Sequence, residues 1–153
     1  FSYAVTSFAA WAVVIALEHQ AEGETESNGL LIKDYAGLGK KSPLLAAIMA
    51  VAMFSFAGVP PTLGFVGKFY LFRTVLEGGF IWLALIGVLT SLISAFYYLR
   101  VIVYMYMYDG EPVIRKETWL YLTAIAGGVG VLLLGIFANP IFSWATQAFL
   151  ELI

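Results

Sequence analysis

Long apolar runs alternate with short polar segments along the chain. The runs approach or exceed the roughly 20 residues that a helix needs to cross the hydrocarbon core of a bilayer. The first run is already apolar at Phe1, which we therefore expect to be an internal residue of a longer protein, so the first helix is truncated. The last is expected to be kinked near Pro140. The pattern predicts an all-α membrane protein with four transmembrane helices, at residues 1–17, 43–76, 80–107 and 118–150.

The longest polar segment, residues 18–42, is expected to be a loop on one side of the membrane. Residues 18–28 are acidic and lack aromatic or aliphatic bulk, which is typical of a mobile loop. Residues 30–41 mix apolar and charged side chains with two glycines. They predict a short interfacial helix that ends at Gly37 or Gly39.

The second apolar run is too long for one straight span, and two prolines in its middle explain why. Pro60 and Pro61 have no N–H to donate, and their rings clash with the carbonyls four residues back, those of Phe56 and Ala57. In hydrocarbon these two free acceptors need water, a side chain or other protein groups. We therefore expect two half-helices, with the break buried in protein. The residues that define this break are Gly58, Pro60, Pro61, Gly64 and Gly67.

The composition supports this assignment and excludes several classes of function. Hydrophobic residues make up 61% of the chain and charged residues 12%, whereas soluble domains carry about 25% charged residues. The net charge of −2 argues against nucleic acid as a partner. The chain has no cysteine, so it cannot hold a disulfide, a zinc–thiolate site or an iron–sulfur cluster. One histidine cannot build a metal cluster.

Lys68 is the strongest candidate for chemistry, because it lies well inside the second run and close to the break. Desolvation disfavours the charged form of an amine, so a lysine in such a place could exchange a proton near neutral pH. No acid lies at the expected membrane depth, so either a partner carboxylate comes from elsewhere or the lysine is often neutral. The alternative is that Lys68 extends to the membrane interface as an anchor. The break favours transport, because discontinuous helices line ion pathways in transporters.

A stripe of hydroxyl groups on the third run is the second candidate. Hydroxyls both donate and accept hydrogen bonds, so with water they could form a proton path. For Thr90, Ser91 and Ser94, helix packing by small polar residues is the simpler explanation. Tyr97 is favoured as a site residue, because a phenol can reach across a wet cavity to a lysine. Arg100 is either a gate at the cytoplasmic end or an interface anchor.

Basic residues fall mainly on one side of the predicted membrane, which orients the spans. We expect the lysine-rich loops to be cytoplasmic and the C-terminus to lie on the opposite side. The far side carries Arg73 alone. The cytoplasmic side collects Lys33, Lys40, Lys41, Arg100, Arg115 and Lys116.

Three stretches together resemble a known family. They are residues 38–43, residues 53–70 (MFSFAGVPPTLGFVGKFY) and residues 96–100 (FYYLR). The chain resembles the C-terminal part of the antiporter-like subunits of respiratory complex I, NADH–quinone oxidoreductase, and within them the subunit N or mitochondrial subunit 2 type. The likeness covers almost the whole chain.

The resemblance implies a function as well as a fold. The four spans would be helices 11 to 14 of a fourteen-helix subunit built from inverted repeats. Lys68 would match a lysine at the outer end of a proton half-channel, and Tyr97 a tyrosine near it. The subunit would move protons across the bacterial inner membrane while other subunits pass electrons from NADH through FMN and iron–sulfur clusters to quinone. It would hold no cofactor itself, catalyse no redox step, and pack against other membrane subunits of the complex.

Other functions share many of these features. A subunit of a multisubunit sodium/proton antiporter would have the same broken helix and lysine. A plastoquinone reductase subunit would differ in its electron donor. A purely structural membrane bundle would use Lys68 only as an anchor.

Overall fold

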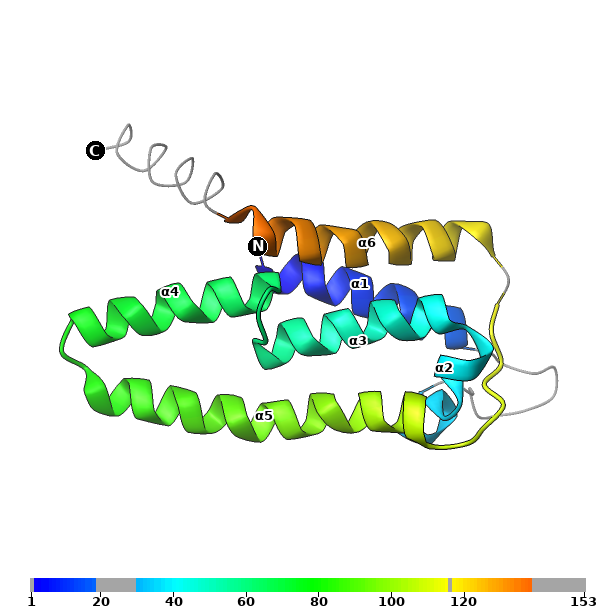
Figure 1. Ribbon diagram of the computed structural model, residues 1–153, viewed down its shortest axis with the longest axis horizontal. Helices are drawn as coiled ribbons and strands as arrows, with labels where there is room; N and C mark the ends of the chain where they lie inside the picture. Colours follow the sequence, from blue (N-terminus) through cyan, green and yellow to red (C-terminus); the bar gives the residue numbers. More distant parts are fainter. Residues whose placement is uncertain (1, 19–29, 116, 139–153) are drawn as a thin grey trace.

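The computed structural model describes residues 2–18, 30–115 and 117–138, and these residues are helical with no β-strand. Five longer helices run roughly parallel or antiparallel to one another (Figure 1). They are α1 (Ser2–Leu17), α3 (Pro43–Ala57), α4 (Leu63–Glu77), α5 (Ile81–Met107) and α6 (Thr118–Ile136). The fold class predicted from the apolar pattern is confirmed.

The predicted break divides the second apolar run into α3 and α4. Each has 15 residues, or about 22 Å at 1.5 Å per residue, which is short of the roughly 30 Å hydrocarbon core. Together they run most of the length of the molecule, and α5 returns beside them in the opposite direction (Figure 1). Val59, Pro60 and Pro61 are exposed, whereas Thr62 and Leu63 are buried. The described residues therefore cover the break only in part, and its burial in protein stays a prediction.

The helices differ in whether each is long enough and apolar enough to cross a membrane. By length and apolar character α5 and α6 could each cross a bilayer. Helices α1 and α3 are apolar but shorter, with 16 and 15 residues. The acidic stretch after Glu18, including His19, and the predicted kink at Pro140 with the helix beyond it lie outside the described residues.

The core forms where α1 lies between α3 and α6 (Figure 1). It is rich in alanine on α1 and α3, and its larger side chains include Val13, Leu45 and Met49. Small residues allow close helix contact, which is how helices associate in lipid, where the hydrophobic effect adds little. By contrast, the α4–α5 pair extends beyond this core, and of the α5 side chains only Ala84 and Met105 are buried.

The short helix predicted to end at Gly37 or Gly39 is replaced by two short helical segments. A 3-10 turn, η1 (Ile32–Tyr35), is followed by a short helix, α2 (Leu38–Lys41). Gly37 separates them with φ +74°, a left-handed conformation that interrupts helical hydrogen bonding. A Cβ at Gly37 would overlap the backbone of Gly110, so the loop after α5 packs directly on this turn.

Ion pairs attach the loop after α5 to α2. Lys40 pairs with Asp109, and the Lys41 amine lies 3.6 Å from a Glu111 carboxylate oxygen. The hydrogen bond from Lys40, and then its charge, hold the pKa of Asp109 below its ordinary value. Both pairs are solvent-exposed, so each contributes little to stability.

The surroundings of Gly127 and Gly130 on α6 predict that alanine destabilises the protein at the first position and not at the second. A Cβ at Gly127 would lie 2.8 Å from the Ala9 Cα atom, where backbone cannot move aside, whereas at Gly130 it would meet only Val5 at 3.6 Å. Gly127→Ala should force α1 and α6 apart and lower the thermal denaturation midpoint of the detergent-extracted protein. Gly130→Ala, the matched control, should leave it unchanged or raise it, because alanine favours helix over glycine by about 0.8–1.0 kcal/mol. Equal midpoints for the two variants would contradict the described packing.

Candidate functional site

Lys68 caps the end of the first half-helix. Its Nζ donates hydrogen bonds to the carbonyl oxygens of Phe56 and Ala57, each at 3.0 Å. These are the two acceptors that Pro60 and Pro61 leave without a helical partner. A positive charge at the C-terminal end of α3 is also favoured by the helix dipole. The expectation that a polar group must meet the freed carbonyls is confirmed, and the group is the candidate lysine itself.

Gly58 makes this contact possible in two ways. It ends α3 with φ +85°, and its N–H bonds back to the carbonyls of Phe54 and Ser55. A Cβ at this position would lie 2.8 Å from Cδ of Lys68. A glycine therefore supplies both the left-handed turn and the space for the lysine stem.

Lys68 is half-buried and lies between two hollows. One, of about 240 Å³, lies between α4 and α5, and Ser91 is the hydroxyl group in its wall. The other, of about 230 Å³, lies on the α1 side and contains Ser2, Thr6 and Ser55 in its wall. Each is several times the roughly 30 Å³ that a water molecule occupies in the liquid. The lysine therefore has room for polar neighbours on both sides.

The structure separates the hydroxyl stripe on α5 into different roles. The Thr90 hydroxyl oxygen lies 3.0 Å from the carbonyl oxygens of Ile86 and Gly87, which share its one proton, and Ser94 donates to the carbonyl of Thr90. Such bonds to the preceding turn satisfy a hydroxyl within its own helix. Ser91 is the stripe member that lines a hollow with Lys68.

Tyr97 is not brought against Lys68. It is 60% exposed, and its ring packs edge-on against Phe96 with centroids 5.7 Å apart. Neither hollow beside the lysine includes it among the described wall residues. The neighbouring Tyr98 lies closer to the break, because its ring stacks on Phe56 at 5.3 Å.

Arg100 is exposed on α5 and lies over a tyrosine. Its guanidinium carbon is 5.8 Å from the ring centroid of Tyr104, a cation–π contact. This surface position fits the anchor interpretation better than a gate.

A buried hydroxyl pair is the part of the site that sequence reasoning did not find. Thr6 of α1 and Ser55 of α3 have their oxygens 2.9 Å apart, and Ser55 also accepts the N–H of Gly64 at 3.0 Å. A sequence signal did exist. Ser55 interrupts an apolar helix three residues before Gly58, and Thr6 lies with Ser2, Tyr3 and Ser7 near one face of the first run.

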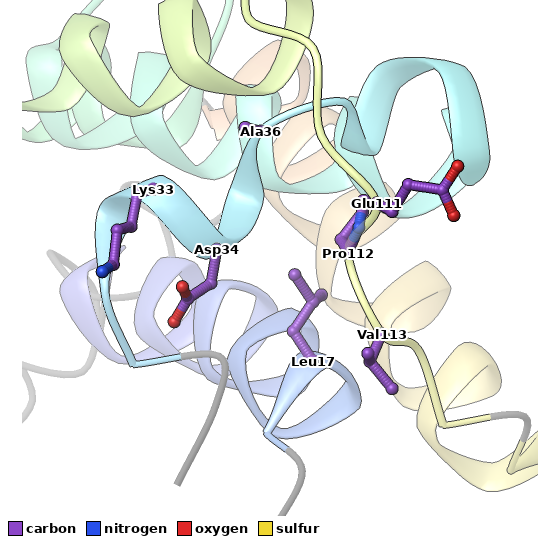
Figure 2. A pocket seen from close by; sticks show the side chains of 7 residues that line it. All are labelled: Leu17, Lys33, Asp34, Ala36, Glu111, Pro112 and Val113. Carbon is purple, nitrogen blue, oxygen red and sulfur yellow. The ribbon is translucent and has the colours of Figure 1, made fainter. Parts of the chain in front are cut away.

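A hollow at the opposite end of the bundle does not form a second site. It has a volume of about 330 Å³ and lies where η1, the end of α1 and the loop after α5 meet. Figure 2 shows Lys33 and Asp34 on one side of Leu17, with Glu111 directed away from them. Among the described residues, no three histidine or acidic side chains gather as metal ligands.

Comparisons with known proteins show which family the chain resembles. Residues 1–94 match the profile of the family described as "NADH:quinone oxidoreductase/Mrp antiporter, TM". The chain is 46% identical over 153 residues to NADH-quinone oxidoreductase subunit N of Trichlorobacter lovleyi, covering 96% of the chain and 30% of that protein. It is 43% identical over 152 residues to the protein of the same name from Chloroflexus aggregans, covering 98% of the chain and 30% of the relative.

A solved structure carries the same fold. A chain of respiratory complex I from Thermus thermophilus with bound aureothin superposes with a TM-score of 0.72 and 28% sequence identity. The match covers 90% of this chain and 31% of the other. The chain thus spans about 30% of the length of the curated relatives it matches. With the family profile matching residues 1–94, the chain belongs to the NADH:quinone oxidoreductase/Mrp antiporter transmembrane family.

Proposed function

We propose that this chain is part of a proton-translocating membrane subunit of a respiratory NADH–quinone oxidoreductase, and that Lys68 is the group that transfers the proton. The observation that carries the proposal is the position of Lys68, at a helix break and between two hollows. The names of the relatives support the choice of complex.

The geometry of the amine suits a group that gains and loses a proton. A charged lysine has three N–H donors, and two of them bond the carbonyls of Phe56 and Ala57. The third is free to face a hollow. When the amine releases a proton to a water there, its two remaining N–H groups still satisfy both carbonyls. Proton exchange therefore leaves the cap on α3 intact.

The same lysine can act as a gate. A proton moving against 100 mV requires about 2.3 kcal/mol, so an open water path through the membrane would dissipate the gradient. A single amine that serves one hollow and then the other transfers one proton at a time. Ser91 borders the α5 side of this path, and Tyr97 would join it if a conformational change turned α5 toward the lysine.

The remaining assignments follow from the proposed complex. Electron transfer from NADH to quinone, with FMN and iron–sulfur clusters, takes place in partner subunits. Neighbouring antiporter-like and small membrane subunits cover the exposed apolar faces of α4 and α5, together with lipid. The location is the bacterial inner membrane, with the loops that carry Lys33, Lys40 and Lys41 in the cytoplasm.

A subunit of a multisubunit sodium/proton antiporter is the second candidate, because the matching family description names that class as well. The two functions differ in what accompanies the subunit. An affinity-purified complex I carries FMN and iron–sulfur absorbance, and an antiporter complex carries neither.

Lys68→Ala should lower NADH-driven proton uptake per electron while the complex still assembles. A positioned proton-transfer group contributes about 10²- to 10⁴-fold to its step. Loss of the cap should also reduce thermal stability, because each unsatisfied carbonyl costs about 1–3 kcal/mol. Uptake is measured with a pH-sensitive dye in inverted vesicles, and assembly by native gel. If pumping and assembly both stay at wild-type levels, the purely structural interpretation holds.

Lys68→Arg should separate the cap from the proton transfer. Arginine keeps a positive charge and several N–H donors, but it does not release its proton in proteins. The variant should assemble and resist heat like the wild type, yet pump as poorly as Lys68→Ala. Lys40→Arg, a matched change at the exposed end, should have no effect on either property. Normal pumping by Lys68→Arg would show that proton release at this position is not required.

A further inference from the structure

Thr6 and Ser55 are polar side chains held in the apolar core by one another. Each is 1% exposed, and they come from different helices, α1 and α3. Their hydroxyl oxygens lie 2.9 Å apart. A buried hydroxyl without a partner costs about 1–3 kcal/mol, so a pair like this is kept only where its bonds are made.

The direction of these bonds can be assigned by counting protons. Thr6 donates to the carbonyl of Ser2 at 3.0 Å, and a hydroxyl has one proton to donate. Ser55 is therefore the donor to Thr6. The Ser55 oxygen in turn accepts the N–H of Gly64 at 3.0 Å. The hydrogen bonds form one series, from the Gly64 amide of α4, through the Ser55 and Thr6 hydroxyls, to the Ser2 carbonyl of α1.

This series is unsuited to carrying protons. The series of hydrogen bonds begins at a backbone amide and ends at a backbone carbonyl. Neither group takes up or releases protons near neutral pH. Both hydroxyls are already satisfied within it. The arrangement instead joins three helices at one point.

This junction lies next to Lys68 and next to the two carbonyls that accept its hydrogen bonds. Ser55 directly precedes Phe56 and Ala57, whose carbonyls accept from the lysine. Gly64 precedes Lys68 by four residues, about one helical turn. The Gly64 amide is one of the first-turn donors that lack a partner within α4, so Ser55 caps it. A Cβ at Gly64 would overlap the Ser55 carbonyl, so the two half-helices cross in direct backbone contact here.

We propose that Thr6 is a positioning residue for Lys68, acting through Ser55. The inference rests on the proposed function, since it assigns Thr6 a part in proton transfer without contact to the proton. Thr6 holds the Ser55 hydroxyl in the rotamer that caps α4. Without it, the Ser55 hydroxyl turns to a carbonyl of its own helix, the α4 amide loses its cap, and the lysine shifts relative to its two acceptors.

The test uses the full-length subunit in its assembled complex, in inverted membrane vesicles. Thr6→Val keeps the branched shape and removes the hydroxyl, and Thr6→Ser keeps the hydroxyl and removes the methyl group. The control is Ser7→Ala, which removes a half-buried hydroxyl from the next residue of α1. Proton uptake per electron is measured for each, alone and combined with Lys68→Arg. Assembly is followed by native gel.

Thr6→Val should lower uptake per electron about fivefold, the equivalent of one hydrogen bond, with assembly retained. Thr6→Ser and Ser7→Ala should behave as the wild type. In the Lys68→Arg background, Thr6→Val should cause no further loss. This combination supports a role through Lys68, because a general loss of stability would add to the lysine defect.

Other outcomes would overturn the inference in distinguishable ways. If Lys68→Arg pumps poorly and Thr6→Val pumps normally, the positioning role fails and the proposed function stands. If both pump normally, both fail. Equal defects in Thr6→Val and Thr6→Ser would assign the effect to the methyl group. If Thr6→Val does not assemble, Ser55→Ala replaces it, and loss of assembly there too would make the pair purely structural and contradict the proposal.

Discussion

Two backbone carbonyls without a helical partner, and one amine that reaches them, determine the arrangement of this chain. The prolines remove the donors that Phe56 and Ala57 would otherwise use, and Lys68 supplies new ones at 3.0 Å. In the same few residues, Ser55 of α3 caps the start of α4. Each half-helix therefore satisfies an end of the other, so an interrupted span can persist in surroundings that offer few hydrogen bonds.

In this reciprocal capping, the residue that stabilises the break is also the proposed proton-transfer group. An anchoring lysine would extend to the membrane surface, away from the helix break. Here the lysine turns back onto the break, with hollows on either side. The contact that stabilises the interruption also leaves one donor of the amine free for exchange. Helix α1, which packs closely against α3 and α6, contacts the break from one side through the hydrogen bond between Thr6 and Ser55.

The sequence predicted the parts of this arrangement that depend on local chemistry. Missing N–H groups at Pro60 and Pro61, the glycine at 58 and the lysine at 68 can all be read without knowing the fold. The pairing of Thr6 with Ser55 could not be, because the two are 49 residues apart and meet only through tertiary packing. The sequence also could not show which of Tyr97 and Tyr98 lies nearer the helix break. Successive helical residues differ by about 100° in direction, and α5 is apolar on nearly all sides. The short helix expected to end at Gly37 or Gly39 is a 3-10 turn that ends before Gly37, and a separate short helix follows this left-handed glycine.

The most direct test of the account is a density map of the assembled complex that resolves ordered water around residue 68. The account predicts the Lys68 amine within hydrogen-bond distance of the carbonyls of Phe56 and Ala57, with water against it in at least one of the two hollows. An amine directed to the lipid headgroups, or hollows filled by side chains or acyl chains with no water in contact, would contradict it.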